Sequence, residues 1–532
     1  MNVRNNPSDG IFHPDSKIYF SSLDSYLDWY LKGKDIKGIY WVGILTHGAS
    51  VFSDNNQVEN ALVYALEQIG LGVIPVFNYL SAEKEESILD LPEIVEKYLI
   101  TEKIHIDGLV HLQMLSAIKE GKLDDLFKQT TEVFKSVNVP IFRPIVSHLQ
   151  TEEEWLDNSS GMAMEIHSSF TTNEMMGMIE PILIGCRDEQ KGLLGKIPIM
   201  DRINRIANRV GKWIEMKNTP NHQKKFVLMI HSSPCSGVEA TIGSGAGLDV
   251  FESLIGIMKA LQENGYLINN IPENGDALRQ IIMDRKAYQD FRWTTVESIV
   301  AGGGVLYKMP MEGEGGYLSF HRELPFQMQN ELEDTWGKVP GEGMVFEGKI
   351  IITGVEFGNV AVMVQPKRGC YGAKCTGEVC KILHDSSCPP PYQYIATYRY
   401  IERIMKAHAI VHVGTGGSLQ YLPGKSNSLS SNCWPDIVLG NTPNLFLYNA
   451  AVGVEGTIAK RRNSAVILDY MPSSFTMDVS KVKLIKRISE YIEALEVESD
   501  QAEIIEMEIQ ERIQSLPRAQ EILRAFPRLP LF

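Results

Sequence analysis

Residues 38–45 read GIYWVGIL, a short apolar run that begins with glycine and is typical of a buried parallel strand. Residues 58–70, VENALVYALEQIG, place apolar side chains at helical spacing and end on a glycine that stops a helix. Residues 72–80, GVIPVFNYL, are apolar again and predict the next strand. Strands that alternate with helices in this way predict a parallel sheet with helices on both of its faces.

The same alternation continues along the chain and begins a second time in its middle. IDGLVHL at 106–112 and VPIFRPI at 139–145 predict further strands of the first sheet. KKFVLMIHSSP at 224–234 predicts the first strand of a second α/β unit. A Gly-rich loop at 241–250 follows it, and then an amphipathic helix at 252–266. The chain therefore predicts two successive units of alternating strands and helices.

The predicted fold class is α/β, with several doubly wound parallel-sheet domains in a multidomain subunit and a helical C-terminal segment. Residues 340–365 predict two strands around a turn, 392–406 a helix and 407–414 a strand. The polar, proline-containing segment 218–225 predicts a domain boundary. The predicted organisation is a lead-in segment at 1–35, a first α/β domain at 36–217, a second α/β region at 218–478 and a helical tail at 479–532.

Composition excludes several classes of protein. The chain has 532 residues, a net charge of −15 and a pI near 5.4, so it lacks the basic footprint that a general nucleic-acid binder needs. No run approaches the roughly 18 apolar residues of a membrane span, and the first residues contain no apolar signal-peptide core. Seven cysteines do not suggest a secreted disulfide scaffold, so we expect a cytoplasmic protein with reduced thiols.

The most specific part of the sequence, the hallmark stretch, covers residues 411–462 and reads VHVGTGGSLQYLPGKSNSLSSNCWPDIVLGNTPNLFLYNAAVGVEGTIAKRR. Three blocks precede it: GIFHPD at 10–15, GSGAGLD at 243–249 and SSCPPPYQYIATYRYI at 386–401. Together they resemble the large, tetrapyrrole-binding subunits of ATP-dependent metal chelatases, of the cobaltochelatase and magnesium-chelatase type. The resemblance extends from the first residues to about position 475. Because those subunits are usually much longer, it implies a short or partial member.

The resemblance implies a large α/β subunit that binds a metal-free tetrapyrrole. The inserted ion would be divalent, with Co²⁺ favoured over Mg²⁺ or Ni²⁺, and a separate AAA+ ATPase complex with associated subunits would drive insertion. The sequence agrees with this division of labour, because it contains no G-x-x-x-x-G-K-[ST] loop for ATP. The nearest candidate, LPGKS at 422–426, has Leu419 at the position of the first glycine. We therefore expect partner subunits alone to use ATP.

Metal insertion needs a base that takes two pyrrole N–H protons and a ligand that hands over the metal, and histidine and carboxylate side chains suit both tasks. In the pattern of the resembled family, two histidines and a glutamate stand where this sequence has Tyr392, Gly416 and Gln420. These changes predict an insertion site that is rebuilt or lost, unless a neighbouring histidine has taken over. A structural role is the alternative for each such histidine. The candidate catalytic residues are two neighbouring histidines, a remaining carboxylate and the replacing amide: His412, His384, Glu455 and Gln420.

A cluster of cysteines precedes the hallmark stretch. Four of the seven cysteines fall within 19 residues at the spacing C-x4-C-x4-C-x7-C, with His384 between the last two. Soft thiolate ligands at this density could hold Zn²⁺ or an iron–sulfur cluster, although the spacing matches no standard pattern. A Gly-rich loop with unpaired thiols is the alternative. The candidate metal ligands are Cys370, Cys375, Cys380 and Cys388.

Basic side chains of the hallmark stretch are candidates for binding the macrocycle. In the context of the resembled family, they could meet the propionate or acetamide arms of a tetrapyrrole. A solvated helix end is the alternative for the three consecutive cations. For the GSGAGLD loop, tight packing is favoured over a phosphate site, because the G-x-G-x-x-G pattern is incomplete. The candidate binding residues are Lys425, Lys460, Arg461 and Arg462.

Three functions are open at the level of sequence. The first is a chelatase subunit that takes part in metal insertion. The second is a degenerate homologue that holds a tetrapyrrole or a metal without inserting it. The third is a dechelatase, which removes a metal from a metallated tetrapyrrole. The loss of the histidines and the glutamate favours the second and third, whereas the LPGK, CWPD and TIAKRR motifs favour tetrapyrrole binding in all three.

Overall fold

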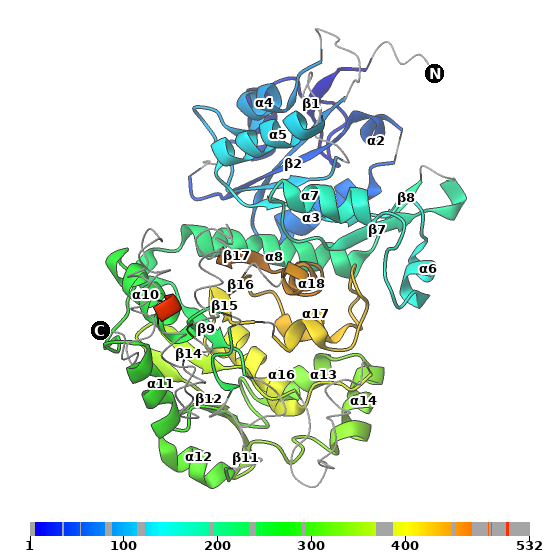
Figure 1. Ribbon diagram of the computed structural model, residues 1–532. Coiled ribbons are helices and arrows are strands. Elements are labelled where there is room, and N and C mark those ends of the chain that lie inside the picture. Colours follow the sequence, from blue (N-terminus) through cyan, green and yellow to red (C-terminus); the bar gives the residue numbers. More distant parts are fainter. Residues whose placement is uncertain are drawn as a thin grey trace. The chain divides into compact units, whose positions relative to one another are not determined.

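A five-stranded sheet forms the core of the amino-terminal half of the computed structural model (Figure 1). Its order is β1-β3-β2-β4-β5, with β2 to β5 parallel and β1 antiparallel at the edge. The apolar runs of the sequence correspond to these buried strands, which confirms the predicted parallel sheet. The strands are β1 (Asp9–Ile11), β2 (Trp41–His47), β3 (Gly72–Asn78), β4 (Gly108–His111) and β5 (Ile141–Phe142).

The structure describes most of the chain up to position 470. The described residues are 6–33, 37–53, 55–79, 88–113, 123–191, 195–232, 241–245, 247–289, 294–368, 387–415, 417–449 and 453–470, with 488, 491 and 507–509 further on. The chain divides into two units, residues 1–470 and 471–532. The helical tail predicted at 479–532 therefore lies almost entirely outside the described residues, and the predicted domain bounds stay predictions.

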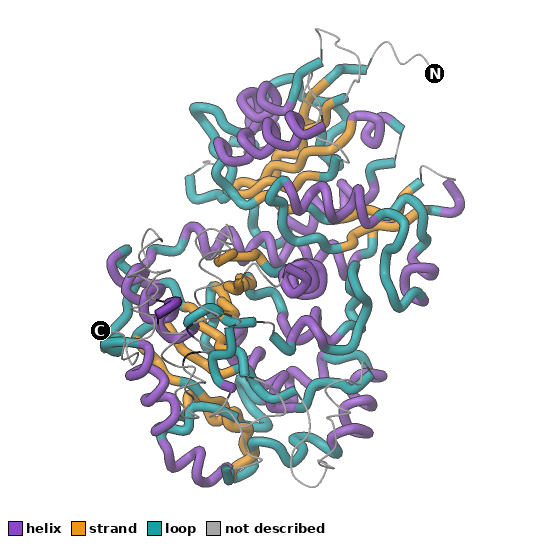
Figure 2. The backbone as a smooth tube through the Cα atoms, in the orientation of Figure 1, coloured by secondary structure: helices purple, strands orange, loops and turns teal. Residues whose placement is uncertain are grey.

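Alternate side chains of β2 pack on opposite faces of the first sheet. Trp41 and Leu45 join one apolar cluster, and Val42 and Ile44 join another. Helices cover both faces, which confirms the doubly wound arrangement (Figure 2). The covering helices are α1 (Leu23–Leu31) and α5 (Leu123–Val137) on one face, and α3 (Gln57–Gln68) and α8 (Met200–Asn218) on the other.

A six-stranded sheet forms the second core, in the order β13-β14-β9-β15-β16-β17. All neighbours are parallel except β13, which forms an antiparallel hairpin with β14. Helices α10 (Val250–Glu263) and α11 (Gly275–Asp284) cover one face, and α13 (Tyr317–Glu323), α14 (Phe326–Trp336), α16 (Tyr392–Arg399) and α17 (Trp434–Leu439) cover the other. The strands are β13 (Val355–Phe357), β14 (Val360–Val364), β9 (Phe226–Ile230), β15 (Ala409–Val413), β16 (Asn444–Asn449) and β17 (Val466–Tyr470).

The segment 340–365 differs from its prediction. The sequence predicts two strands around a turn, but the segment contains four strands: β11 (Val345–Phe346), β12 (Lys349–Thr353), β13 and β14. β12 pairs with β10 (Val305–Met309) and β11 in a separate antiparallel sheet. The chain changes sheets at Gly354, where a Cβ atom would lie 2.6 Å from the Leu306 side chain. The break between β12 and β13 is hard to predict from sequence, because the apolar run continues across it and only a glycine stands at the break.

Helix α8 connects the two cores. Its Arg209 binds the buried carboxylate of Glu180 and also donates to the carbonyl oxygens of Gly440, at 3.0 Å, and Thr442, at 3.3 Å. Arg202 on the same helix donates to Asp436 of α17 at 2.9 Å. A small sheet beside α8 contains β6 (Ile145–Val146), β7 (Leu183–Arg187) and β8 (Lys196–Pro198). The two cores of residues 1–470 are thus joined by buried polar contacts.

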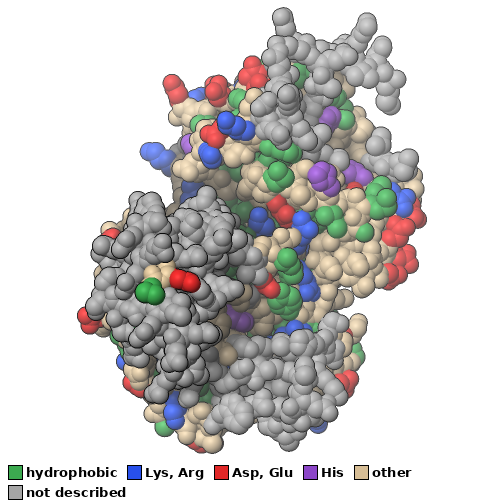
Figure 3. Space-filling view, viewed as in Figure 1, with side chains coloured by type: hydrophobic (Ala, Val, Ile, Leu, Met, Phe, Trp, Pro, Cys, Tyr) green, Lys and Arg blue, Asp and Glu red, His purple; other side chains and the backbone are tan. Residues whose placement is uncertain are grey.

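The surface carries charges of both signs. Figure 3 shows Lys and Arg side chains interspersed with Asp and Glu on the face that it presents.

Within the described part of the chain, no helix combines the length and the apolar character that crossing a membrane requires.

Candidate functional site

The carboxyl ends of three neighbouring strands meet at one edge of the second sheet. β14, β9 and β15 are parallel, with Val364 opposite Ile230 and Ile230 opposite Val413. The next residues continue the ladder, because the Gln365 amide donates to the Ile230 carbonyl at 2.9 Å and the His231 amide donates to the Val413 carbonyl at 3.2 Å. Ligands of open α/β sheets bind outside this edge.

The Gly-rich loop packs directly against the start of the hallmark stretch. The Thr415 amide donates to the Ser244 carbonyl at 3.0 Å, and the Gly243 amide donates to the His231 carbonyl at 3.0 Å. Gly414 has φ +130°, and a Cβ atom there would lie 2.7 Å from the Ser244 carbonyl oxygen. Glycine is therefore required at 414 by the close approach of the two loops.

His412, a candidate catalytic residue, lies buried on β15 with both ring nitrogens engaged. Nδ1 lies 2.8 Å from Asn444 Oδ1, and Nε2 lies 3.0 Å from the Tyr398 hydroxyl. Asn444 Nδ2 donates to the Asn463 carbonyl at 3.2 Å, which orients the Asn444 amide with its oxygen toward the ring. This network assigns the proton to Nδ1, so that Nε2 accepts from Tyr398.

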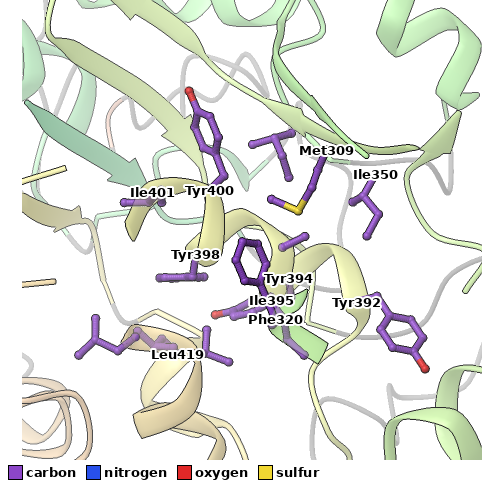
Figure 4. Close-up of a cluster of buried hydrophobic side chains, with 14 of the residues drawn as sticks. Met309, Phe320, Ile350, Tyr392, Tyr394, Ile395, Tyr398, Tyr400, Ile401 and Leu419 are labelled. Carbon is purple, nitrogen blue, oxygen red and sulfur yellow. The ribbon is translucent and has the colours of Figure 1, made fainter. Parts of the chain in front are cut away.

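Gln365 extends this network to the hallmark stretch. Its amide nitrogen donates to the hydroxyls of Tyr398 at 3.0 Å and Tyr394 at 3.2 Å, and its oxygen accepts from the Ser418 amide at 2.9 Å. The Tyr394 hydroxyl lies 2.8 Å from Ser418 Oγ. Figure 4 shows Tyr394 and Tyr398 on α16 among apolar neighbours that include Leu419. The strand edge and the loop after β15 are thereby held together by buried side chains.

This buried network is uncharged at neutral pH. Burial lowers the pKa of His412 to about 4 and raises the pKa of Tyr394 to about 12. Burial also raises the pKa of Tyr398 well above its ordinary value. To accept a proton, His412 would have to give up its hydrogen bond from Tyr398. The arrangement suits a residue that positions the loop better than one that removes protons from a substrate.

His231 is a second histidine at this edge, and it is not among the candidate residues that the sequence indicates. Burial lowers its pKa, an effect that a side-chain hydrogen bond with Gln365 opposes, and its Nδ1 is buried without a hydrogen-bond partner in the described residues. A neutral imidazole with an open nitrogen can act as a base or as a metal ligand. Its position directly after the apolar strand 226–230 was a signal that could have identified it.

The structure brings together Gln420 and Glu455, two candidate catalytic residues. Glu455 lies in the first turn of α18 (Gly453–Asn463) and accepts from Gln420 Nε2 at 3.3 Å and from the Tyr421 hydroxyl. Burial and this hydrogen bond raise the pKa of Tyr421. Gln420 is buried, whereas Glu455 is half-buried and Tyr421 is exposed. The carboxylate is therefore reachable from solvent beside a phenol.

Lys425 contacts the amino-terminal half of the chain. Its Nζ donates to the carbonyl oxygens of Leu156 at 2.8 Å and Asn158 at 2.7 Å, and it lies 5.7 Å from the centre of the Trp155 ring. Burial lowers the pKa of Lys425. Its ammonium group thus caps the carboxyl end of helix α6 (Glu152–Asp157), whereas the sequence predicts a role in binding an acidic ligand.

The three consecutive cations at the end of α18 have different surroundings. Arg462 stabilises the LPGK turn at 422–425 through hydrogen bonds to backbone carbonyls. It donates to the carbonyl oxygens of Gln420, Leu422, Gly424 and Lys425. Arg461 binds both carboxylate oxygens of Glu174 at 3.0 Å. Lys460 makes no hydrogen bond or ion pair in the described part of the structure, and it lines a cavity of about 280 Å³. Of the four candidate binding cations, Lys460 alone keeps its charge available.

The chain matches the family described as CobN/Magnesium Chelatase over residues 2–525. The chain belongs to the CobN/magnesium chelatase family. It is 42% identical to an uncharacterized protein of Methanocaldococcus jannaschii over 87% of this chain and 38% of that protein. It is 27% identical to the chloroplastic magnesium-chelatase subunit ChlH of Oryza sativa subsp. indica over 91% of this chain and 33% of that subunit.

The solved structure of the catalytic subunit of cobaltochelatase from Mycobacterium tuberculosis shares the fold of this CobN/magnesium chelatase family member. The TM-score is 0.69 at 22% identity, and the match covers 96% of this chain and 40% of that subunit. The aerobic cobaltochelatase subunit CobN of Pseudomonas aeruginosa is 28% identical over 64% of this chain and 26% of its own length. The chain therefore spans about two-fifths or less of these chelatase subunits.

Several predicted positions of this chelatase family member lie outside the described residues. They are Cys370, Cys375, Cys380, His384 and Gly416. Cys388 is described; it is buried and lies 3.7 Å from the Pro389 carbonyl oxygen. The described residues contain no group of three His, Cys, Asp or Glu side chains that could hold a metal ion. The proposed cysteine cluster stays a prediction.

Tyr392 is a buried residue of the apolar core in this family member. It lies at the start of α16, and its hydroxyl donates to the Gly337 carbonyl at 2.8 Å. Its ring meets the Tyr317 ring edge to face, with 5.9 Å between the ring centres. The position where the resembled pattern has a histidine is thus used here to pack α16 against the segment at 317–337.

Proposed function

We propose that this chain is the tetrapyrrole-binding part of a metal chelatase large subunit. Divalent metal, with Co²⁺ favoured over Mg²⁺ or Ni²⁺, is the second substrate, and AAA+ partner subunits hydrolyse the ATP that drives insertion. The observation that carries this proposal is family membership over residues 2–525. The buried network at the strand edge supports it, because the network holds the hallmark loop where α/β proteins bind ligands.

Glu455 is the best-placed proton acceptor for this reaction. Its carboxylate is half-buried beside the exposed Tyr421 hydroxyl, and it belongs to the hallmark stretch. A carboxylate can take pyrrole N–H protons or pass a divalent ion to nitrogen ligands. Gln420 orients Glu455 through its amide, and His231 offers a neutral nitrogen at the neighbouring strand end. His412 then serves as a positioning residue.

A second candidate function is tetrapyrrole binding without insertion, or removal of a metal from a metallated macrocycle. It is favoured by the environment of His412, whose pKa burial lowers to about 4 and whose two nitrogens are both engaged. Gln420 also offers an amide, which cannot take a proton at neutral pH. Both functions need the same macrocycle site, so binding is the first property to test.

The test is an anaerobic absorbance titration of the purified chain with metal-free hydrogenobyrinate diamide, sirohydrochlorin and protoporphyrin. A saturable spectral shift at micromolar macrocycle is expected, and the preferred macrocycle identifies the substrate class. The absence of a shift with all three would contradict both candidate functions for this chain. Glu455→Gln should bind the preferred macrocycle with unchanged affinity and slow metal insertion by 10²–10⁴-fold when the ATPase partners and Co²⁺ are supplied, a range typical of general acid–base catalysis.

A further inference from the structure

A cavity of about 280 Å³ lies between the two cores of residues 1–470, which contain the five-stranded and the six-stranded sheet. Residues 169–181, in the segment that precedes β7, form one wall, and α18 with β16 and β17 forms the other. Ligand pockets for drug-sized molecules have volumes of about 300–1,000 Å³. The cavity is thus large enough for a small ion or one arm of a larger ligand, and too small for a whole tetrapyrrole.

Arg143 places a buried positive charge on the wall of this cavity. Arg143 is only 6% exposed and lines the cavity. Its Nη1 donates to the carbonyl oxygens of His111 at 2.9 Å and Pro144 at 3.4 Å. Nε has no partner, and no carboxylate of the described residues contacts this guanidinium. Burial lowers the pKa of Arg143 to about 10, so it remains protonated at neutral pH. Buried charges without a counter-ion are rare, because their desolvation is unfavourable.

The acidic side chains of the cavity wall do not compensate this charge. Glu174 is bound through both oxygens by Arg461, and Glu180 is bound by Arg209 and by the Trp213 indole at 2.8 Å. Each acid is therefore neutralised by its own arginine. Lys460 lines the same cavity and makes no hydrogen bond or ion pair in the described residues. The local excess is two positive charges, from Arg143 and Lys460.

The second cavity of the structure provides a contrast. It has a volume of about 370 Å³, and four arginines and four acids line it. The arginines are paired with these acids: Arg202 and Arg205 with Asp436, Arg202 with Asp201, Arg399 with Glu402, and Arg403 with Glu323. Of these two cavities, the smaller one therefore has the unbalanced positive charge.

The position of the smaller cavity in the fold also suits an anion. Arg143 directly follows β5, and it reaches the carbonyl of His111, the last residue of β4, so it spans two carboxyl ends of the parallel sheet. Gly453, the first residue of α18, lines the cavity as well. The amino end of an 11-residue helix favours negative charge.

We propose that this cavity binds a small oxyanion, a carboxylate or a phosphate, between Arg143 and Lys460. The anion is either free in solution or an acidic arm of the bound macrocycle, and the second case rests on the proposed function. Both sources share one chemistry, because planar guanidinium donors and an ammonium group complement carboxylate and phosphate oxygens.

The first experiment is calorimetric titration of the full chain with inorganic phosphate and with acetate, at constant ionic strength adjusted with chloride. Saturable binding of at least one anion is expected for the natural chain. Lys460→Met should weaken it at least tenfold, whereas Lys349→Met, at an exposed strand position in a different sheet, should leave it unchanged. Absence of saturable binding of either anion, or equal affinity in Lys460→Met, would overturn the proposal.

A charge-reversal variant keeps the test independent of lost packing. In Lys460→Glu, the new carboxylate can pair with Arg143 in the cavity that the anion otherwise occupies. We expect this variant to have a higher Tm than the natural chain in anion-free buffer, and to gain no further Tm from phosphate. A phosphate-dependent rise in Tm equal to that of the natural chain would contradict the assignment of Lys460.

The source of the anion is identified by comparing protoporphyrin with its dimethyl ester in the presence and absence of saturating phosphate. If phosphate weakens binding of the free acid but not of the ester, an acidic arm of the macrocycle occupies the cavity. If phosphate affects neither, the site takes a free anion, and either result retains the site. Failure of every macrocycle to bind would contradict the proposed function and leave the phosphate result intact.

Discussion

At the scale of single residues, polar groups of the hallmark stretch divide into those that hold the fold and those that remain available. His412, Lys425 and Arg462 are each surrounded by protein partners. Glu455 and Lys460 keep access to solvent or to a cavity. Residue type alone does not separate the two groups, because a buried cation and a ligand-binding cation look alike in sequence.

The buried His412 predicts a dependence of stability on pH. Its folded pKa is about 4, whereas the unfolded value is about 6.5. Between these values the unfolded state binds a proton that the folded state does not, so the free energy of unfolding falls as pH decreases from 6.5 to 4. The loss is roughly 3 kcal/mol at the lower limit. Urea denaturation at a series of pH values from 4 to 7 gives the free energy of unfolding as a function of pH. In His412→Asn this dependence should be weaker, by the equivalent of about one proton taken up on unfolding. Identical slopes would contradict this prediction.

Tyr398 predicts a measurable effect of one hydroxyl group. Tyr398→Phe leaves the buried Nε2 of His412 and one proton of the Gln365 amide without partners. We expect the free energy of unfolding to fall by about 1–3 kcal/mol. Tyr400→Phe, directly after α16, is the matched control, because no protein hydrogen bond to its hydroxyl occurs in the described residues. Equal effects of the two substitutions in urea denaturation would refute the importance of the network.

At the scale of elements, α8 is the connection between the two cores, and Arg209 is its central residue. Arg209→Met would leave the carboxylate of Glu180 buried without its cation and would remove two hydrogen bonds to the turn before β16. The free energy of unfolding should fall by about 3–5 kcal/mol. Lys212→Met, at a half-buried position of the same helix where the ion pair with Glu215 is exposed to solvent, should change it by less than about 0.5 kcal/mol. Denaturation curves of both variants check this expectation.

The LPGK turn is an element whose place depends on contacts distant in sequence. Lys425→Met removes donors from the carbonyls of Leu156 and Asn158, and we expect a destabilisation of about 1–3 kcal/mol. Amide hydrogen exchange should accelerate at Met162, whose amide donates to Asn427 Oδ1 at 2.9 Å. Ser426→Ala on the same turn serves as the control. Unchanged exchange at 155–162 in Lys425→Met would show that the turn is held by other contacts.

At the scale of the whole molecule, the two cores of residues 1–470 should unfold together. Apolar residues of β16 and β17 pack against the cluster that α3 and α8 form on the first sheet, and Arg209 adds buried polar contacts. Pulse-labelled hydrogen exchange across a urea series should give one midpoint for peptides from β2 and β15. Two separate midpoints would indicate independent domains, with the boundary predicted at 217/218 as the natural place of separation.

Much of the fold could be predicted because burial leaves a periodic signal. The runs at 38–45, 72–80 and 224–234 contain β2, β3 and β9, and helical spacing at 58–70 corresponds to α3. The change of sheet at Gly354 could not be predicted, since it involves contacts with β10, such as that of Leu306, which is distant in the sequence. The spacing of apolar residues along the sequence indicates which face of a helix or strand is buried. It does not indicate which other element covers that face.

The α/β class, the family and the lack of a G-x-x-x-x-G-K-[ST] motif follow from residue type and order along the chain. The surroundings of the polar residues follow from the three-dimensional fold. It joined His412 to Gln365 through Tyr398, assigned Arg461 to Glu174, and left Lys460 with Arg143 at an unbalanced cavity. The physical reason is that the state of a charged or polar group depends on its solvation and its neighbours, and these come from segments far apart in the chain.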